Sequence, residues 1–432
     1  MRPFWALSFA ILLVVAIAGS IFPYPSTDHG GGPVNPADVA WMLTATGLVL
    51  LMTPGLSYFY GGMVSAKNVI STMLQSFIAM AVVSILWVVV GFSLAFGDSI
   101  GGLVGNPLTF LMFRGVGTAT HPTLSPTIPL LLLAMFQLKF AIITPALITG
   151  SFAERVRFSS YLVFMVLFSL LIYAPLAHMT WHPDGFLRKM GVLDFAGGAV
   201  VHMSAGFAAL AGAMYLGRRE SHKNGTKHKP ANIPYVLLGT GLLWFGWFGF
   251  NAGSALGANE SAVLAFATTN TASAAAALAW VFYDAMRGRK ASALGASVGA
   301  VVGLVAITPA AGYVSIGASI AIGTIASLIS NVAVSWKASS NLDDTLDVFP
   351  CHGLGGFVGM FATAVFAKDT GLIFGETALF WAHLKGLVFV SAFTFLGSWL
   401  LYRVTNLLIP VRVAREQEQV GLDLSQHGEA TA

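Results

Sequence analysis

Residues 193–206, LDFAGGAVVHMSAG, place an acid and an imidazole in a segment of small and apolar side chains. Asp194 opens the stretch, His202 follows eight residues later, and small and apolar residues continue to Met214. Such a segment is typical of a buried helix. An ionisable group inside a buried apolar helix is costly to keep there, so it is a functional candidate by default.

The composition indicates a membrane protein. Of the 432 residues, 56% are hydrophobic and 9% are charged, whereas a soluble domain carries about 25% charged residues. Apolar runs of about 18 residues or more recur along the chain, which is the length that spans a bilayer as a helix and is too long for a barrel strand. The sequence therefore predicts an all-α polytopic membrane protein.

About eleven spans are expected beyond residue 37. Basic residues are concentrated in one set of loops, which includes Lys67, Arg155, Arg219 and Arg412, and are sparse on the other side. The positive-inside rule places the rich side in the cytoplasm, the mature N-terminus outside and the C-terminus inside. An odd number of spans agrees with that result. The expected spans are 38–62, 69–96, 128–150, 160–180, 196–217, 232–256, 262–285, 291–309, 312–335, 350–367 and 378–409.

The chain divides into three parts on this reading. Residues 1–26 have an early Arg2, an apolar core and Ala16-Ile17-Ala18 as a small-residue cleavage site, which favours a secretory signal peptide over an uncleaved N-terminal hydrophobic segment. Residues 38–410 form the transmembrane domain. Residues 411–432 form a charged cytoplasmic tail, for which the simplest expectation is disorder.

Several function classes are disfavoured. The single cysteine, Cys351, excludes an internal disulfide and a cysteine-based metal site. No GxxxxGK[ST] loop is present, so transport driven by ATP bound to this chain is not expected. The basic residues are distributed among loops rather than gathered in a patch for nucleic acid. No cofactor and no metal are predicted.

The sequence suggests an internal duplication. TGLVLLMTPGLSYFYGG (46–62) is similar to TGLLWFGWFGFNAGS (240–254), and LDFAGGAVVH (193–202) is similar to LDVFPCH (346–352). Five spans separate the members of each pair, so the two halves must be inverted relative to each other. Inverted repeats commonly place a substrate path at their interface near the bilayer midplane.

Two histidines occupy matching places in these repeats. His202 lies in the fifth span and His352 in the tenth, so a pseudo-twofold axis would bring the imidazoles face to face. Facing imidazoles could share a proton or line a narrow polar seam, whereas lone ones would simply bond a helix carbonyl. Asp194 and Asp347 precede the same two spans, where a carboxylate suits the positive end of a helix.

Some aromatic residues stand beside polar groups. FQLKF (136–140) and WFGFNAGS (247–254) lie in the third and sixth spans, and Trp181 ends the fourth. An aromatic face attracts a desolvated cation by roughly 2 kcal/mol, although a tryptophan at this depth is more often an interfacial anchor.

At this point the chain resembles the ammonium transporter family, and within it the bacterial and archaeal Amt type, related to the Mep and Rhesus proteins. The resemblance begins near residue 38 and continues to the C-terminus. It rests on PGLSYFYGGMVSAKN (54–68), FGDS (96–99), ITPALITGSFAERVRF (143–158), HMTW (178–181), LDFAGGAVVH (193–202), WFGFNAGSALGANE (247–260), DDTLDVFPCHGLGG (343–356) and GLDLSQHGE (421–429). It implies eleven spans in a 5+5 repeat and a homotrimer with one pore per subunit.

The resemblance also implies roles for individual residues. Ammonium would be recruited at an outer aromatic site, pass a stacked phenylalanine gate as it loses a proton, and cross a hydrophobic twin-histidine pore as ammonia. The implied recruitment residues are Trp181, Phe140, Ser254 and Asp194, with Gln137 as a polar neighbour; the gate is Phe136 or Phe140 with Phe250; the pore residues are His202 and His352.

The resemblance covers the tail as well. Gly421, Asp423, His427, Gly428 and Glu429 match a C-terminal motif that packs under a neighbouring subunit and couples the three pores. A cytoplasmic PII-type regulatory protein is a possible partner. One position departs from the family pattern: Lys139 stands before Phe140 where an apolar residue is usual. It could snorkel, pair with another subunit, or repel cations.

Three alternatives to an Amt-type transporter of the cell membrane were weighed. A passive Rhesus-like ammonia channel is not expected to need the full set of outer aromatic residues. A sensor would be expected to carry a signalling domain, whereas this tail has about 20 residues. An intramembrane aspartyl hydrolase is disfavoured because Asp194 and Asp347 fall on opposite faces in the predicted topology.

Overall fold

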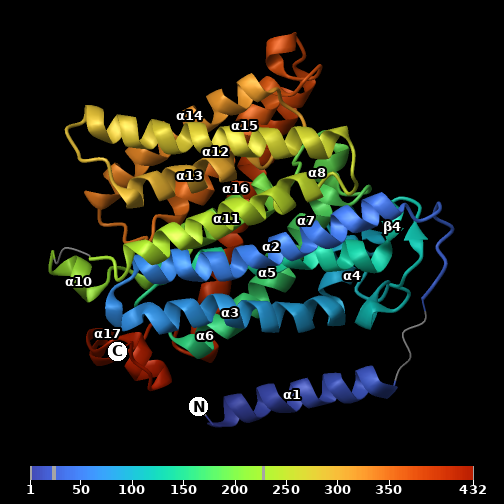
Figure 1. The fold of residues 1–432 in the computed structure, drawn as a ribbon. Coiled ribbons are helices and arrows are strands. Elements are labelled where there is room, and N and C mark those ends of the chain that lie inside the picture. The colour runs from blue at the N-terminus through green and yellow to red at the C-terminus, as the bar shows by residue number, and fades with distance from the viewer. Residues whose placement is uncertain (1, 22–25, 226–228, 432) are drawn as a thin grey trace.

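The computed structural model describes residues 2–21, 26–225 and 229–431, and it shows a bundle of long helices (Figure 1). We call the end of the bundle that carries the C-terminal tail the inner end, and the opposite end the outer end. The prediction of an all-α polytopic membrane protein is confirmed.

The first five predicted spans are helices or helix runs. Three of them contain a π-helical turn, marked η, within the run. The elements are α2 (Pro36–Met63); α3 (Val69–Leu86), η2 (Trp87–Gly91) and α4 (Phe92–Phe96); α5 (Leu130–Phe152); α6 (Phe158–Phe168), η4 (Ser169–Tyr173) and α7 (Ala174–Trp181); and η5 (Gly198–Met203) with α9 (Ser204–Leu216).

The next five predicted spans are also helices or helix runs, and one further helix follows them. The elements are α11 (Ile233–Gly253), α12 (Glu260–Met286), α13 (Ala293–Ile307), α14 (Ile316–Ala338), η6 (Phe349–Gly353) with α15 (Leu354–Phe366), and α16 (Ala378–Leu408). Within the described residues, ten of the eleven predicted spans have at least 18 residues, whereas α13 has 15. At 1.5 Å per residue α13 covers about 22 Å, less than a bilayer core of about 30 Å.

The connections are built from short elements. Those at the outer end are β1 (Ser99–Ile100), β2 (Val104–Gly105), η3 (Leu111–Phe113), β3 (Thr120–His121), β4 (Ser125–Pro129), α8 (Phe186–Lys189) and η7 (Leu372–Phe374); β1 pairs antiparallel with β2, and β3 with β4. Those at the inner end are η1 (Ala66–Asn68), α10 (Glu220–Lys223), α17 (Arg415–Val420) and η8 (Asp423–His427).

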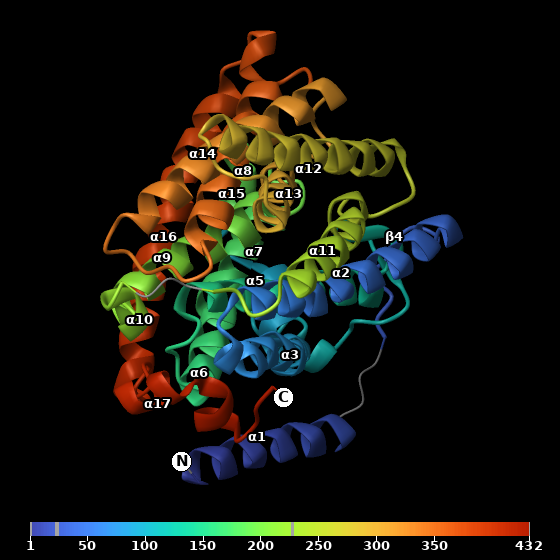
Figure 2. The same ribbon diagram turned by 60° about the vertical axis from the view of Figure 1, so that its left-hand side comes forward.

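The N-terminal hydrophobic segment is a helix beside the bundle. α1 (Arg2–Ile21) is an eleventh helix long and apolar enough to cross a membrane among the described residues. Both views show it alongside the bundle with its N-terminus near the C-terminus of the chain (Figures 1 and 2). The ring of Trp5 stacks 6.5 Å from that of Phe158, while most of the helix is exposed. Whether this segment is cleaved stays a prediction.

Glycines bring the two halves together at the centre of the bundle. A β-carbon on Gly206 in α9 would lie 2.1 Å from the backbone nitrogen of Gly353 in η6. A β-carbon on Gly356 would lie 2.8 Å from the carbonyl oxygen of Gly198. Small residues allow such close backbone contact between helices in a membrane. The two helices that carry His202 and His352 are therefore in direct backbone contact.

Candidate functional site

The outer end holds a cavity of about 270 Å³ that contains most of the predicted recruitment residues. Trp181, Asp194 and Ser254 line it, each brought by a different segment. Gln137 from α5 lines it as well. Phe140 is buried beneath this group, with its ring 5.9 Å from that of Trp181 and at 87° to it. The structure thus brings the four residues of the recruitment set together.

Asp194 organises the wall of this cavity through the backbone. Its carboxylate accepts the N–H groups of the next helix start, at 2.8 Å from Gly197, 2.6 Å from Gly198, 2.8 Å from Ala199 and 3.2 Å from Val200. Its carbonyl oxygen accepts the Trp181 indole N–H at 3.0 Å. Since these amides are otherwise orphaned at a helix start, the Asp194 carboxylate caps η5, while the Asp194 backbone carbonyl fixes the indole.

One acceptor in the cavity wall, the Ser254 hydroxyl, is free to meet a cation. The Ser254 hydroxyl donates its hydrogen to the carbonyl of Phe250 at 2.8 Å, which leaves its lone pairs available. The Gln137 side-chain oxygen is buried and has no hydrogen-bond partner among the described residues. A cation with N–H donors suits such acceptors, whereas a buried acceptor without a partner is costly.

A pair of stacked rings closes the floor of the cavity. The rings of Phe140 and Phe250 lie 4.1 Å apart with 26° between their planes. Phe136 meets Phe140 edge-on at 4.9 Å, and it packs against the backbone of Gly253. The stacked pair is therefore Phe140 with Phe250, and Phe136 supports it from the side.

The two histidines face each other below these rings. The Nδ1 atoms of His202 and His352 are 3.3 Å apart, which makes one hydrogen bond whose proton sits on either ring. The Nε2 atom of His202 is buried without a partner among the described residues. Beside them is an otherwise apolar cavity of about 10 Å³, bounded above by Phe250. On this measure a water molecule needs roughly 10–15 Å³, so the cavity fits one molecule of that size.

Comparison with known proteins identifies this arrangement. Residues 40–432 match the profile of the Ammonium Transporter Family. The chain belongs to that family. It is 44% identical over 406 residues to a putative ammonium transporter of Methanothermobacter thermautotrophicus, which covers 92% of this chain and 98% of that protein. It is 45% identical over 403 residues to an ammonium transporter of Aquifex aeolicus, with 92% and 93% covered. The crystal structure of Saccharomyces cerevisiae Mep2 superposes with a TM-score of 0.84 at 33% identity, covering 89% of each chain.

The internal repeat in the sequence pairs Asp194 with Asp347 as the acids that precede the two histidine helices. This pairing is wrong. Asp344, not Asp347, accepts the backbone N–H of Phe349 in η6, at 2.7 Å, and thus caps the turn that carries His352. Asp344 precedes His352 by eight residues, the same spacing as Asp194 and His202, so this signal was available in the sequence. Asp347 instead has a left-handed backbone and pairs with Lys337 at 2.6 Å. Burial raises the pKa of Asp344 to about 6, and the ammonium of Lys337 opposes that rise.

Sequence reasoning also missed residues that line the path. The indole of Trp247 stacks 5.3 Å from the His202 ring, and its N–H donates to the hydroxyl of Thr308 at 2.9 Å. Arg188 lines the outer cavity and donates to the carbonyl of Trp181 at 3.3 Å. Neither role leaves a distinct pattern, because an aromatic residue within a span and an arginine in a loop are common in membrane proteins.

Most of Lys139 is buried. Its side chain belongs to a residue that is 7% exposed, and it makes no hydrogen bond or ion pair among the described residues. It does not line the outer cavity. The three explanations for this lysine therefore stay open.

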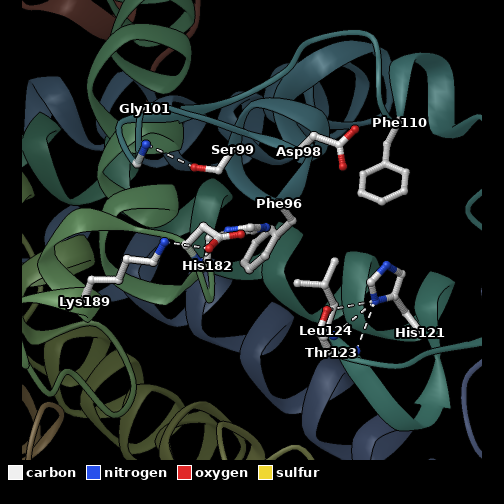
Figure 3. Close-up of a pocket in the computed structure, with 12 residues that line it drawn as sticks. Phe96, Asp98, Ser99, Gly101, Phe110, His121, Thr123, Leu124, His182 and Lys189 are labelled. Carbon is white, nitrogen blue, oxygen red and sulfur yellow. Dashed lines mark hydrogen bonds and ion pairs between the residues drawn. The ribbon is translucent and has the colours of Figure 1, made fainter.

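A second cavity adjoins the first at the outer end (Figure 3). It measures about 570 Å³ and shares Phe96, Thr123 and Leu124 with the recruitment cavity. Its polar lining carries both signs of charge: Asp98, His121, His182, and the pair of Lys189 with Asp184 at 2.7 Å. The wider cavity is therefore a charged space beside the recruitment cavity.

The C-terminal motif is ordered against its own chain, contrary to the expectation of disorder. The carboxylate of Asp423 accepts the first N–H groups of α3, from Ile70 at 3.1 Å and Ser71 at 2.7 Å. Gly421 has a φ of +109° and lies against Lys67. His427 contacts the hydroxyl of Ser71 at 3.2 Å. Gly428 turns the chain with a φ of +69°, and the N–H of Glu429 donates to the carbonyl of Asp423 at 3.2 Å.

Buried ion pairs join the tail to the inner loops. Arg219 pairs with Glu154 at 2.8 Å and with Asp343 at 2.9 Å, and all three side chains are at most 8% exposed. In the tail, Glu418 pairs with Arg412 at 2.7 Å and accepts the N–H of Glu220 at 2.6 Å. Burial alone would raise the pKa of Asp343, but the guanidinium groups of Arg155 and Arg219 hold it well below its usual range. The inner loops and the tail therefore form one charged layer.

Proposed function

We propose that the chain carries ammonium across the cell membrane by recruiting the cation, removing its proton and passing ammonia. One observation supports this most strongly. A stacked ring pair separates a polar cavity of about 270 Å³ from a cavity of about 10 Å³ that is lined by two hydrogen-bonded histidines. Only a small molecule without its hydration shell fits the second space.

The energetics favour ammonia as the species in the lower cavity. Transfer of a bare ion into an apolar interior costs on the order of tens of kcal/mol, whereas a neutral polar molecule costs far less. The outer cavity offers an indole face and the Ser254 hydroxyl, which stabilise a cation before it loses its proton. Potassium can use the ring face but cannot give up a proton. Selectivity thus follows from deprotonation.

The histidines supply the proton path in this proposal. A single proton between the two Nδ1 atoms can move from one ring to the other when either Nε2 gains or loses a proton. The free Nε2 of His202 faces the apolar cavity and is the first acceptor. Asp194 acts through the backbone, because its carboxylate already accepts four hydrogen bonds from backbone N–H groups.

Proteoliposomes loaded with the purified protein test this mechanism. An ammonium gradient should produce a current or a rapid change of internal pH, and a potassium gradient should produce neither. His352→Asp keeps a titratable group but breaks the imidazole pair, so it should change both the flux and the ammonium-to-potassium selectivity. Unchanged flux and selectivity in that variant would contradict the relay. Internal alkalinisation without current in the wild type would favour the passive Rhesus-like alternative, and binding without flux the sensor.

We further propose the placement and assembly of the chain. The inner end carries Lys67, Arg155, Arg219 and Arg412, so the positive-inside rule orients it to the cytoplasm and the recruitment cavity to the outside. The working unit is a homotrimer, and the tail layer is the contact for a PII-type regulatory protein. Native mass measurement of the purified protein tests the trimer. Co-purification of a PII-type protein with the full chain, lost in a chain ending at Ala414, tests the contact.

A further inference from the structure

A buried histidine in the last span is bonded at both ring nitrogens. His383 lies in α16 and is fully buried. Its Nδ1 contacts the carbonyl oxygen of Met360 at 2.7 Å, and its Nε2 contacts the backbone nitrogen of Leu193 at 3.0 Å. A carbonyl can only accept and an amide can only donate, so these partners assign a neutral ring with the proton on Nδ1.

The histidine connects the last two spans to the segment that enters the fifth span, which is distant in the sequence. Leu193 directly precedes Asp194, in the segment that enters the helix of His202. Met360 lies in α15, eight residues beyond His352 on the continuous helix that follows η6. α16 lies outside the two five-span halves, so a side chain of the extra span joins the entry of the fifth span to the body of the tenth.

The segment held by His383 builds one wall of the outer cavity. The Asp194 carbonyl fixes the Trp181 indole, and the Asp194 carboxylate caps η5. On the far side of Asp194, the N–H of Phe195 donates to the carbonyl of Pro309 at 3.1 Å. Hydrogen bonds from the N–H groups of Leu193 and Phe195 thus hold the backbone on both sides of Asp194. Of these two bonds, the one at Leu193 is accepted by a side chain. Removing that acceptor would leave a buried N–H unsatisfied and free the Trp181 support to shift.

We propose that His383 is a positioning residue of the recruitment site, which holds the Leu193–Asp194 segment so that Trp181 and the Asp194 cap keep the geometry that binds ammonium. This inference rests on the proposed function of that cavity. The position requires a donor and an acceptor on one short, buried group. A carboxamide offers both at a similar spacing, whereas an aliphatic side chain offers neither.

The test compares three variants in proteoliposomes. His383→Gln should keep the half-saturating ammonium concentration within about two-fold of the wild type. His383→Leu should raise it by about ten-fold to a hundred-fold, since displacement of a binding group by about 1 Å carries effects of this size. Thr394→Val is the matched control and should change nothing: Thr394 is buried on α16, and its hydroxyl has no partner among the described residues.

Two results would overturn the proposal. One is an unchanged half-saturating concentration in His383→Leu, whatever its maximal rate. The other is an equal loss in His383→Gln and His383→Leu, which would mean that the ring matters for its volume rather than for its two bonds. If His383→Leu does not fold, His383→Asn replaces it, because its shorter carboxamide cannot reach both partners; it should then show the same rise, and a wild-type value would contradict the proposal.

Hydrogen exchange separates this inference from the transport mechanism. In the folded protein, the backbone amides of residues 193–198 should exchange faster in His383→Leu than in His383→Gln or Thr394→Val. This measurement needs no ammonium flux. A wild-type protein that carries no ammonium would defeat the proposed function and leave the exchange result standing, whereas equal exchange in all variants would defeat the positioning role alone.

Discussion

Replacing Gly206 by alanine should separate the two pore histidines. The added β-carbon would lie 2.1 Å from the backbone nitrogen and 2.2 Å from the Cα atom of Gly353. Ordinary van der Waals contact begins at 3.4 Å, so the two helices must move apart by about 1.3 Å. The obstacle is backbone, so no side-chain rotation relieves it. Because Gly353 follows His352, the shift carries that imidazole away, and the 3.3 Å contact between the Nδ1 atoms opens beyond hydrogen-bonding range.

Two measurements check this prediction. Overpacking of this kind costs about 1–3 kcal/mol, so the purified Gly206→Ala protein should unfold at a temperature several degrees lower, and its ammonium flux in proteoliposomes should be largely lost. Gly47→Ala and Gly241→Ala are matched controls in α2 and α11, where a β-carbon meets no atom within 4 Å. They should equal the wild type or exceed it slightly in stability. A Gly206→Ala protein as stable and active as these controls would refute the reasoning from backbone contact.

Three further predictions concern the outer site and the inner layer. Ser254→Ala removes an acceptor for a charged ligand, worth about 1.5–3 kcal/mol, and should raise the half-saturating ammonium concentration by about ten-fold or more with the maximal flux kept; a change below two-fold would contradict it. The pKa of Asp343 is held below its usual range by Arg155 and Arg219 against the effect of burial, so its stabilising contribution is complete above about pH 4 and is lost as the pH falls through the folded-state pKa. Melting curves of Asp343→Asn should therefore show a weaker loss of stability in acid than the wild type, and parallel losses would count against the ion pair. Deletion of residues 415–432 removes the Asp423 cap from α3 and should lower both melting temperature and flux, whereas normal values would show that the tail is dispensable.

The spans could be predicted because hydropathy alone sets them. A bilayer requires long apolar helices, and the loops between them carry most of the charge. The predicted bounds consequently follow the helices within the described residues, and α11 and α13 are each four residues shorter than the spans 232–256 and 291–309. The π-helical turns could not be predicted, since no residue pattern distinguishes them from α-helix. They matter, because η5 and η6 carry the histidines.

The sequence predicts which residues belong to the site, but not which of them contact one another. Phe136 and Phe140 are four residues apart on one face of α5, so the sequence could not tell which of them stacks on Phe250. Packing decides: a β-carbon at Gly253 would lie 2.8 Å from the Phe136 ring, which shows that this ring fills the gap beside α11 and leaves the stack to Phe140. Composition alone predicts a disordered tail, because its residues are polar, whereas the family resemblance implies a tail that packs under a neighbouring subunit. Its order comes from specific bonds to helix ends, which composition does not report.

The two halves of the pore are alike at their centre and different at their ends. Asp194 and Asp344 each precede a histidine by eight residues and cap the π-helical turn that carries it, so the positive helix ends at both mouths meet a carboxylate. The outer carboxylate is saturated by four amides, whereas one oxygen of Asp344 has no hydrogen-bond partner among the described residues. Trp181 and Ser254 stand at the outer mouth, where the proposed mechanism distinguishes ammonium from potassium. Symmetry therefore explains why the histidines meet, and the departures from symmetry are the reason why we propose that recognition belongs to the outer end.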